Sequence, residues 1–324
     1  MKRKVTIGIA AYNEENNILS TLKSVESSLL KINNLSHYIL VCVNGCTDKT
    51  KEIVERYAKK SKIHVRVIES KRGKLKAHKK IIEESKDGYI LFLDADVVVS
   101  TDTLKKLINE LDKSPLIQVV SAYPYTKDPK NAKLYQRILY PLLNLKRIYP
   151  QIEIAREDVK KYHPFASSSY ELKSRVYFHG RCFIIRNKKV YRFPKQGTGI
   201  RGDDTYLSFY ILKNYAPGAI RVLFDAPVYS DPNLSLRGYL REWLRIRKDV
   251  ELIYQNYRSF EPLRKITSMK LNWRFVLMGL PFRFKLYGLL YYFLKKFETI
   301  AYNLKRKSIL IDDIWQYENK NSYT

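Results

Sequence analysis

The chain has 324 residues, of which 45% are hydrophobic, and it carries 60 Lys and Arg against 32 Asp and Glu, a net charge of +28. This length allows one large domain or two ordinary ones, and the charge favours polyanionic partners. Three cysteines without a paired motif argue against a disulfide framework and favour a reducing compartment. Zinc-finger spacing, an aromatic RNA-binding signature and a basic zipper are lacking, so nucleic acid is not an expected partner.

The first third of the chain predicts alternating strands and helices. Val5–Ala10 is rich in β-branched residues, and from Ile18 to Leu30 apolar residues recur three and four apart, as in a helix. Two further strands, Tyr38–Val43 and His64–Glu69, are each followed by a helix pattern, and a fourth apolar run begins at Tyr89. This alternation predicts an α/β fold with a Rossmann-like, mostly parallel sheet flanked by helices.

The fourth strand ends in two carboxylates, Asp94 and Asp96. Residues two apart on an extended chain point to the same side, and ligands of open α/β sheets bind outside the carboxyl ends of the strands. Mg²⁺ is usually held by one or two carboxylates together with substrate phosphates. The pair therefore predicts a site for a metal-bound nucleotide, with Mn²⁺ or Mg²⁺ as the cofactor.

A second acidic pair, Asp203-Asp204, follows a glycine-containing segment over residues 197–202 and opens an apolar helix. The start of a helix keeps a carboxylate ionised, which suits a general base. The alternative is that Asp203 only caps the helix and Asp204 is an acidic residue of its first turn.

Five short segments of the chain form a larger pattern. They are Ala11-Tyr12-Asn13-Glu14, Asn44-Gly45-Cys46-Thr47-Asp48, Gly73-Lys74, Asp94-Ala95-Asp96 and Gly202-Asp203-Asp204. Together, over roughly residues 4–250, they resemble the family 2 glycosyltransferases, whose nucleotide-binding fold is called GT-A. The resemblance implies an inverting, hexosyltransferase-like enzyme that uses a nucleoside-diphosphate sugar, with UDP as the expected nucleotide.

The resemblance also implies a role for each site residue. The expected nucleotide contacts are Ala11, Tyr12, Glu14, Asn44, Lys74, Asp94 and Arg245. Asp96 would hold the metal together with Asp94, and Asp204 would take the acceptor proton. The family usually has Pro at the position of Ala11 and Asp at the position of Asn44, so contacts to the edge of the base are expected to differ here.

The segment Leu236–Ile246 resembles the flanks of a Gln-x-x-Arg-Trp motif in family members that polymerise sugars. Arg245 is kept and can pair with the diphosphate, whereas Glu242 and Ile246 replace the amide and the indole. We therefore expect a non-processive enzyme that adds one sugar or a few. The metal, Lys74 and Arg245 would offset the negative charge that grows on the leaving diphosphate.

The predicted catalytic domain covers residues 1–250, with a nucleotide-binding half at 1–100 and an acceptor half at 101–250. Residues 251–324 form a basic, aromatic, amphipathic helical extension. No segment has the roughly 20 apolar residues that a spanning helix needs, so Trp273–Lys307 predicts a foot on an anionic membrane surface. Leu134–Ile154 is a candidate second surface. The alternative for the extension is packing on the catalytic domain.

These expectations place the enzyme in the cytoplasm, peripheral or monotopic at the cytoplasmic face of a membrane, with a lipid-linked or surface glycan precursor as acceptor. Two other classes of function stay open. A non-catalytic membrane- or polyanion-binding protein on a degenerate transferase fold fits the charge, but not the retained carboxylates. A haloacid dehalogenase-type phosphatase also has an Asp-x-Asp at a strand end, but its nucleophile is expected on the first strand.

Overall fold

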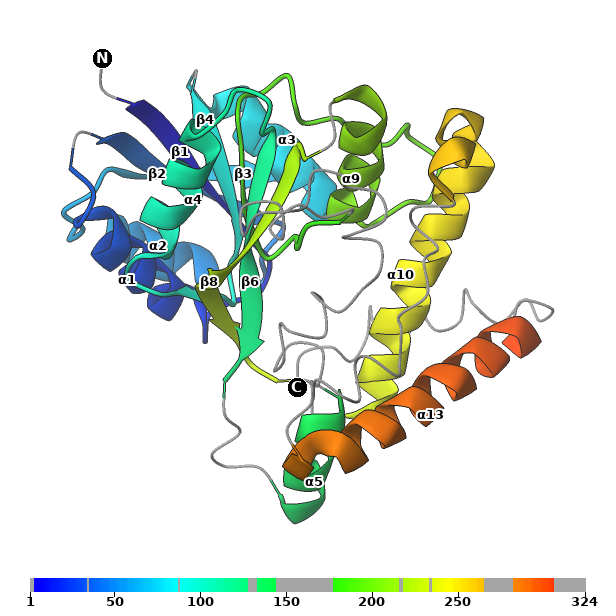
Figure 1. Ribbon diagram of the computed structural model, residues 1–324. Helices are drawn as coiled ribbons and strands as arrows, with labels where there is room; N and C mark the ends of the chain where they lie inside the picture. Colours follow the sequence, from blue (N-terminus) through cyan, green and yellow to red (C-terminus); the bar gives the residue numbers. More distant parts are fainter. Residues whose placement is uncertain are drawn as a thin grey trace. The chain divides into compact units, whose positions relative to one another are not determined.

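The computed structural model describes residues 3–33, 35–86, 88–127, 133–143, 177–215, 218–232, 235–264 and 282–305. The chain divides into two compact units (Figure 1). The first unit comprises Met1–Lys127, Glu157–Asp231 and Asp249–Met269, and the second comprises Asp128–Arg156, Pro232–Lys248 and Lys270–Thr324. The predicted domain boundary after residue 250 falls within one helix, Leu236–Asn256, and stays a prediction.

One half of the sheet in the first unit consists of parallel strands in the order β3-β2-β1-β4. Their bounds are β1 (Arg3–Ala11), β2 (Leu35–Asn44), β3 (Val65–Ser70) and β4 (Tyr89–Asp94). In the registers, Ala10 of β1 pairs with both Cys42 of β2 and Asp94 of β4. The carboxyl ends of these strands therefore meet at one edge of the sheet, and the predicted positions of the four strands are confirmed.

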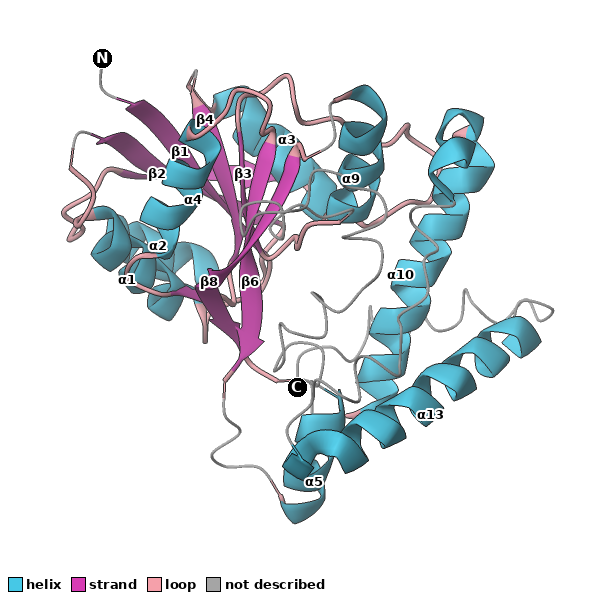
Figure 2. Ribbon diagram, in the orientation of Figure 1, coloured by secondary structure: helices cyan, strands magenta, loops and turns pink. Residues whose placement is uncertain are grey.

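Helices cover both faces of this sheet (Figure 2). The helices of the first unit are α1 (Ile18–Leu29), α2 (Thr50–Ala58), α3 (Lys74–Glu84), α4 (Thr103–Asp112) and α9 (Asp203–Asn214). Ile18 of α1 and Leu107 of α4 pack with Ile7 and Ile9 of β1 in one core. The apolar faces of α3 and α9 pack in a second core on the other side of the sheet. The α/β class predicted from the alternating pattern is confirmed.

Gly8 of β1 sets how closely α3 approaches the sheet. A Cβ atom at this position would lie 2.4 Å from Cγ2 of Ile81, which is shorter than any real contact. Because a side chain here would push α3 away, the glycine permits a close strand-to-helix approach. The first turns of α3, which carry Lys74 and His78, are thereby held at the carboxyl edge of the sheet.

The other half of the sheet is mixed. It contains β5 (Val98–Val99), β6 (Val119–Thr126), β7 (Cys182–Ile185) and β8 (Ile220–Ser230), in the order β7-β6-β8-β5 after β4. The strand β7 runs antiparallel to both β4 and β6, whereas β6 and β8 are parallel, with a register shift after Ala122. The buried β7 brings the loop at Gly180 and Arg181 next to the end of β4, where Asp94 N–H donates to Arg181 O at 2.9 Å.

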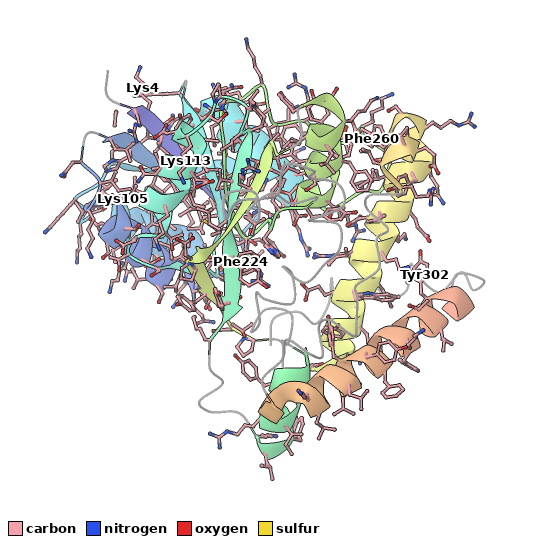
Figure 3. The ribbon with its side chains drawn as sticks, in the orientation of Figure 1. Lys4, Lys105, Lys113, Phe224, Phe260 and Tyr302 are labelled. Atoms are coloured by element: carbon pink, nitrogen blue, oxygen red, sulfur yellow. The ribbon has the colours of Figure 1, made fainter. Side chains whose placement is uncertain are left out.

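The described helices of the second unit are α5 (Leu134–Leu143), α13 (Phe282–Lys305) and the first part of α10 (Leu236–Asn256). Tyr302 of α13, which is labelled in Figure 3, packs edge to face on Trp243 of α10. The ring centroids lie 6.0 Å apart. The guanidinium of Arg247 lies 4.3 Å from the Tyr302 ring centre, a cation–π contact. The predicted foot begins at Trp273 and the second surface ends at Ile154, and both of these residues lie outside the described ones.

One face of α13 is apolar and exposed. Its residues recur at helical spacing, and their exposed fractions are Leu286 64%, Leu289 43%, Leu290 44%, Phe293 59%, Phe297 56% and Ile300 58%. The neighbouring α5 also exposes Leu134 (76%), Tyr135 (56%) and Ile138 (56%). We call these nine residues the apolar face of the second unit. Over the described residues, none of the helices combines the length and hydropathy of a membrane span.

Candidate active site

Asn44, at the end of β2, ties together three loops at the carboxyl edge of the sheet. Its side chain is buried, with 4% exposed. The amide nitrogen donates to Ala11 O at 2.9 Å, and the amide oxygen accepts from Gly73 N–H at 3.1 Å. Asn44 and the buried Ala11 thus have structural roles here, and their predicted contacts with a nucleotide stay predictions.

The loop after β1 is fixed by hydrogen bonds to the loop after β2. Asn13 adopts a left-handed backbone conformation with φ of 52°, which asparagine tolerates better than most residues. Its side-chain oxygen accepts from Thr47 N–H at 2.9 Å, and Glu14 N–H donates to Thr50 Oγ1 at 2.7 Å. The positions of the flanking Tyr12 and Glu14 are therefore well defined. The Arg72 guanidinium lies over the Tyr12 ring, 4.5 Å from its centre.

Glu14 is half-buried among other carboxylates. Burial raises its pKa to about 7, and the charges of Asp96, Asp94 and Asp48 act in the same direction, against a hydrogen bond from Asn17. A group with this pKa binds and releases a proton near neutral pH. The fold therefore brings Glu14 into the electrostatic field of the Asp94 and Asp96 pair.

Lys74 and Asp94, both predicted from sequence, meet at the strand ends. Lys74 is the first residue of α3 and follows Gly73, whose φ of 132° favours glycine. Its Nζ lies 2.6 Å from Asp94 Oδ1 and 4.0 Å from Asp203 Oδ1. Burial would lower the pKa of Lys74, but the carboxylates of Asp94 and Asp203 outweigh burial and raise that pKa above its ordinary value. Lys74 is thus a fixed positive charge between two carboxylates.

Asp96 has a weaker partner. Arg181 Nη1 lies 3.7 Å from Asp96 Oδ2. Burial, followed by the charge of Asp94, raises the pKa of Asp96, and Arg181 opposes this only in part. The carboxylate therefore lies where additional positive charge would be stabilising.

We asked whether these residues suit a divalent cation. Within the described ranges, no three His, Cys, Asp or Glu side chains gather into a metal-binding group. Asp94 and Asp96 would then supply two carboxylate ligands from the protein. Two carboxylates are typical of Mg²⁺ sites in which substrate phosphates complete the coordination. The incomplete compensation of Asp96 by Arg181 points the same way. The residues present fit a cation that arrives with a nucleotide.

The two residues of the second acidic pair have different surroundings, although both lie in the first turn of α9. Asp204 Oδ2 accepts from Gly180 N–H at 3.0 Å, and its Oδ1 accepts from Thr205 N–H at 2.8 Å. A Cβ on Gly180 would lie 2.7 Å from Asp204 Oδ2, so this approach requires glycine. Asp203 is instead buried and faces Lys74, His78 and Tyr191. The side-chain partners of Asp203 rule out a role as a helix cap alone.

Several residues of this region were missed by sequence reasoning. Asp249 is buried, and its two oxygens accept from Arg201 N–H and Gly202 N–H, each at 2.9 Å, which orients the turn before the acidic pair. No sequence signal marks Asp249. His78, in contrast, lies four residues after Lys74 on one helix face, a signal that could have linked them.

Arg245 lies on α10 within the second unit. Its predicted contact with the diphosphate is therefore not tested by the geometry of the first unit and stays a prediction.

The sequence matches the model of a family described as Glycosyl transferase family 2 over residues 6–191. It is 33% identical over 132 residues to an uncharacterized protein of Methanocaldococcus jannaschii, covering 39% of this chain and 55% of that protein. It is also 29% identical over 116 residues to a poly-beta-1,6-N-acetyl-D-glucosamine synthase of Staphylococcus epidermidis, covering 36% of this chain and 27% of the synthase. The matches thus span about half and about a quarter of these relatives.

A solved mannosyltransferase of Pyrobaculum calidifontis, in complex with GDP-Man and Mn²⁺, has a similar structure. The TM-score is 0.59 at 17% sequence identity, covering 83% of this chain and 70% of the mannosyltransferase. At this identity the likeness concerns the fold, and it confirms the predicted GT-A fold.

Proposed function

This chain belongs to glycosyl transferase family 2, and we propose that it transfers a sugar from a nucleoside-diphosphate sugar to an acceptor hydroxyl. The observation that carries the proposal is the contact between Lys74 and Asp94, 2.6 Å long, beside the undercompensated Asp96. A fixed cation next to carboxylates that favour a divalent ion is what a diphosphate leaving group requires. We propose UDP as the nucleotide, with Tyr12 and Glu14 as its contacts and with Asn44 supporting them through the loops that its side chain holds together.

In this reaction the bond between the anomeric carbon and the diphosphate oxygen breaks, and a bond from that carbon to the acceptor oxygen forms. The Lys74 ammonium would stabilise the charge on the departing diphosphate, and Arg245 would assist. Mn²⁺ or Mg²⁺, held by Asp96 and Asp94, would supply Lewis-acid stabilisation of the same group. The position of Asp96 near Asp94, with the Arg181 guanidinium 3.7 Å away, supports this assignment.

We assign the proton of the acceptor hydroxyl to Asp204. Its hydrogen bonds to Gly180 N–H and Thr205 N–H keep the carboxylate in one orientation, and the start of α9 favours its ionised form. One base on the face opposite the leaving group implies inversion at the anomeric carbon. Glu242 and Ile246, which stand in place of Gln and Trp, support transfer of one sugar or a few.

We further propose that the enzyme acts on a lipid-linked or surface glycan precursor at the cytoplasmic face of an anionic membrane. The apolar face of the second unit supports this proposal, because exposed apolar surface combined with flanking cations suits the headgroup region of a bilayer. Lys285 and Lys296 on α13 and Arg137 on α5 are exposed and supply such cations. The three free cysteines are compatible with a reducing compartment.

Release of nucleoside diphosphate tests the proposed function. The protein is incubated with UDP-glucose, UDP-GlcNAc or GDP-mannose, with Mn²⁺ or EDTA, and with or without a lipid extract. We expect release from a UDP-sugar that needs Mn²⁺ and increases with the extract. Absence of release from all three donors, together with no thermal stabilisation by any of them, would contradict the proposal.

A further inference from the structure

A buried polar cluster lies beneath the candidate active site, and the chemistry proposed above does not use it. Its members are His78 of α3, Tyr191 after β7 and Asp203 of α9, with exposed fractions of 1%, 3% and 5%. Burying a carboxylate costs free energy unless it is paired and hydrogen-bonded. The partners of Asp203 therefore decide whether the carboxylate remains ionised in this position.

The hydrogen bonds within this cluster are mutually consistent. His78 Nδ1 lies 2.9 Å from Asp203 Oδ2 and 2.8 Å from Tyr191 Oη, and Tyr191 Oη donates to Asp203 Oδ2 at 3.1 Å. Because an ionised carboxylate only accepts, Nδ1 of His78 carries the hydrogen that faces Asp203. One oxygen of Asp203 is thus held by two donors from separate segments.

The other oxygen of Asp203 faces the active site. Lys74 Nζ lies 4.0 Å from Asp203 Oδ1 and 2.6 Å from Asp94 Oδ1. Burial alone would raise the pKa of Asp203, but Lys74, then His78 and Tyr191, lower it well below the ordinary value. Asp203 is therefore a permanent negative charge behind the ammonium group of Lys74.

The surroundings prevent His78 from turning away. Its ring centroid lies 4.6 Å from that of Phe92 and 5.9 Å from that of Tyr191. Phe92 and Asp94 are two residues apart on β4 and so lie on the same face of the strand. Lys74 and His78 are one helical turn apart on α3. The aromatic packing, the helix and the strand end thus fix the histidine, the lysine and both carboxylates relative to one another.

We propose that His78 and Tyr191 are positioning residues, which hold Asp203 so that it keeps the Lys74 ammonium beside Asp94, where the diphosphate of the donor binds. This inference rests on the proposed function for its ligand. It assigns the two acidic neighbours different tasks: Asp203 orients the cation on the leaving-group side, and Asp204 faces the acceptor proton. A purely stabilising role for the cluster is the alternative.

Two matched substitutions of one residue separate these roles. In His78→Asn the side-chain nitrogen is the same number of bonds from Cα as Nδ1, so a donor to Asp203 is retained. In His78→Leu the volume is largely kept and the donor is lost. Tyr191→Phe removes only a hydroxyl and is a milder variant should His78→Leu fail to fold.

The first readout is binding of UDP and GDP with Mn²⁺, compared with binding of uridine and guanosine. We expect His78→Leu to weaken diphosphate binding about 10-fold, the scale on which supporting partners act, with nucleoside binding unchanged. His78→Asn should stay close to wild type, and Tyr191→Phe should fall between the two. Unchanged diphosphate binding in His78→Leu or in Tyr191→Phe, or equal losses for diphosphate and nucleoside, would overturn the inference.

A double-mutant cycle tests whether the effect passes through Lys74. In a Lys74→Met background, His78→Leu should cause no further loss of diphosphate binding. A further loss as large as in the wild-type background would contradict the positioning role.

A readout without any nucleotide separates this inference from the proposed function. Limited labelling of the protein alone with acetic anhydride, followed by mass spectrometry, reports how well Lys74 is held. We expect Lys74 to be protected in wild type and His78→Asn, and to react faster in His78→Leu and Tyr191→Phe. If wild type binds neither UDP nor GDP, the proposed function fails while this labelling still decides the inference. Equal reactivity in all variants would overturn it.

Discussion

The two units of the molecule differ in which side chains they bury and which they expose. In the first unit even charged groups are buried and partnered, as with Asp203, which is 5% exposed, and Asp249, which is 3% exposed. In the second unit large apolar groups are exposed, as with Leu286 at 64% and Phe293 at 59%. Hydrophobic burial is the main force that stabilises a fold, so exposed apolar residues at regular helical spacing point to a surface that binds something else.

Each unit departs from ordinary burial where its proposed task lies. The first unit buries charged side chains, and these hold the Lys74 ammonium and the carboxylates in place at the strand ends. The second unit exposes apolar surface beside Lys285 and Lys296, which suits an anionic lipid surface. If the division of tasks is correct, variants in one unit should leave the property assigned to the other unchanged.

The largest effect is expected for Asp204→Asn. Loss of the proposed base should lower kcat by about 10²-fold or more, while UDP binding and vesicle binding stay as in wild type. The conservative Asp225→Asn, at an exposed carboxylate paired with Lys106, is the control and should leave kcat unchanged. A product that retains the donor's anomeric configuration, detected by NMR, would reject the single-base mechanism.

The next effect concerns Asp96. Asp96→Ala should weaken Mn²⁺-dependent UDP binding by at least about 30-fold, because the variant removes one of the two carboxylates proposed to hold the metal, and loss of such a partner typically costs about 10- to 100-fold in metal affinity. Calorimetry with and without EDTA measures the effect, and Asp231→Ala, at an exposed carboxylate, is the control. Equal affinity in Asp96→Ala and wild type would refute the metal assignment.

A smaller effect is expected in the second unit. Phe293→Ser should weaken binding to vesicles of anionic phospholipid about 10-fold, since burying a phenylalanine contributes roughly 1.5–3 kcal/mol. Leu116, 61% exposed in the first unit, offers the matched control Leu116→Ser. If the full-length protein does not bind anionic vesicles at low salt, the assignment of membrane binding to the second unit is wrong. High salt should weaken the binding but leave an apolar remainder.

The smallest effect is the pH dependence of stability at Glu14. Its folded-state pKa of about 7 lies above the ordinary 4.5, so the folded state binds more protons between these values and loses stability as pH rises through this window. In metal-free protein, Glu14→Gln should remove this loss. Because Glu14 is only half-buried, we expect about 1 kcal/mol at pH 8, or about 2 °C in Tm. Identical Tm profiles for both proteins would contradict the raised pKa.

Much of the first unit could be predicted because its strands and helices are marked by short contiguous stretches of sequence. The strand runs and the residues that follow them are contiguous in sequence, and parallel strands bring their carboxyl ends to one edge. That rule places Lys74 and Asp94 at the same edge, but β2 and β1 separate β3 from β4, so the contact between the two residues also depends on α3 packing back across the sheet against β1. The arrangement around Asp203 did not follow, since His78 and Tyr191 are 113 residues apart and meet only through packing.

The antiparallel β7 illustrates a second limit. A four-residue apolar strand, Cys182–Ile185, carries no sequence signal for its direction or its neighbours. Its placement between β4 and β6 depends on pairings that only the whole sheet determines. The position of Gly180 beside Asp204 depends on that pairing. For the second unit, the helical periodicity was visible in the sequence, but the sequence left open whether its apolar side is exposed or packs on the catalytic domain.

The hydrogen bonds of Asn44 limit which residues can replace it. Its amide both donates, to Ala11 O, and accepts, from Gly73 N–H. An ionised aspartate, the residue usual at this position in the family, can only accept and would face the Ala11 carbonyl oxygen in a buried setting. Substitution toward the family consensus at this one position should therefore loosen the loop after β1, and a successful redesign would have to change that loop at the same time.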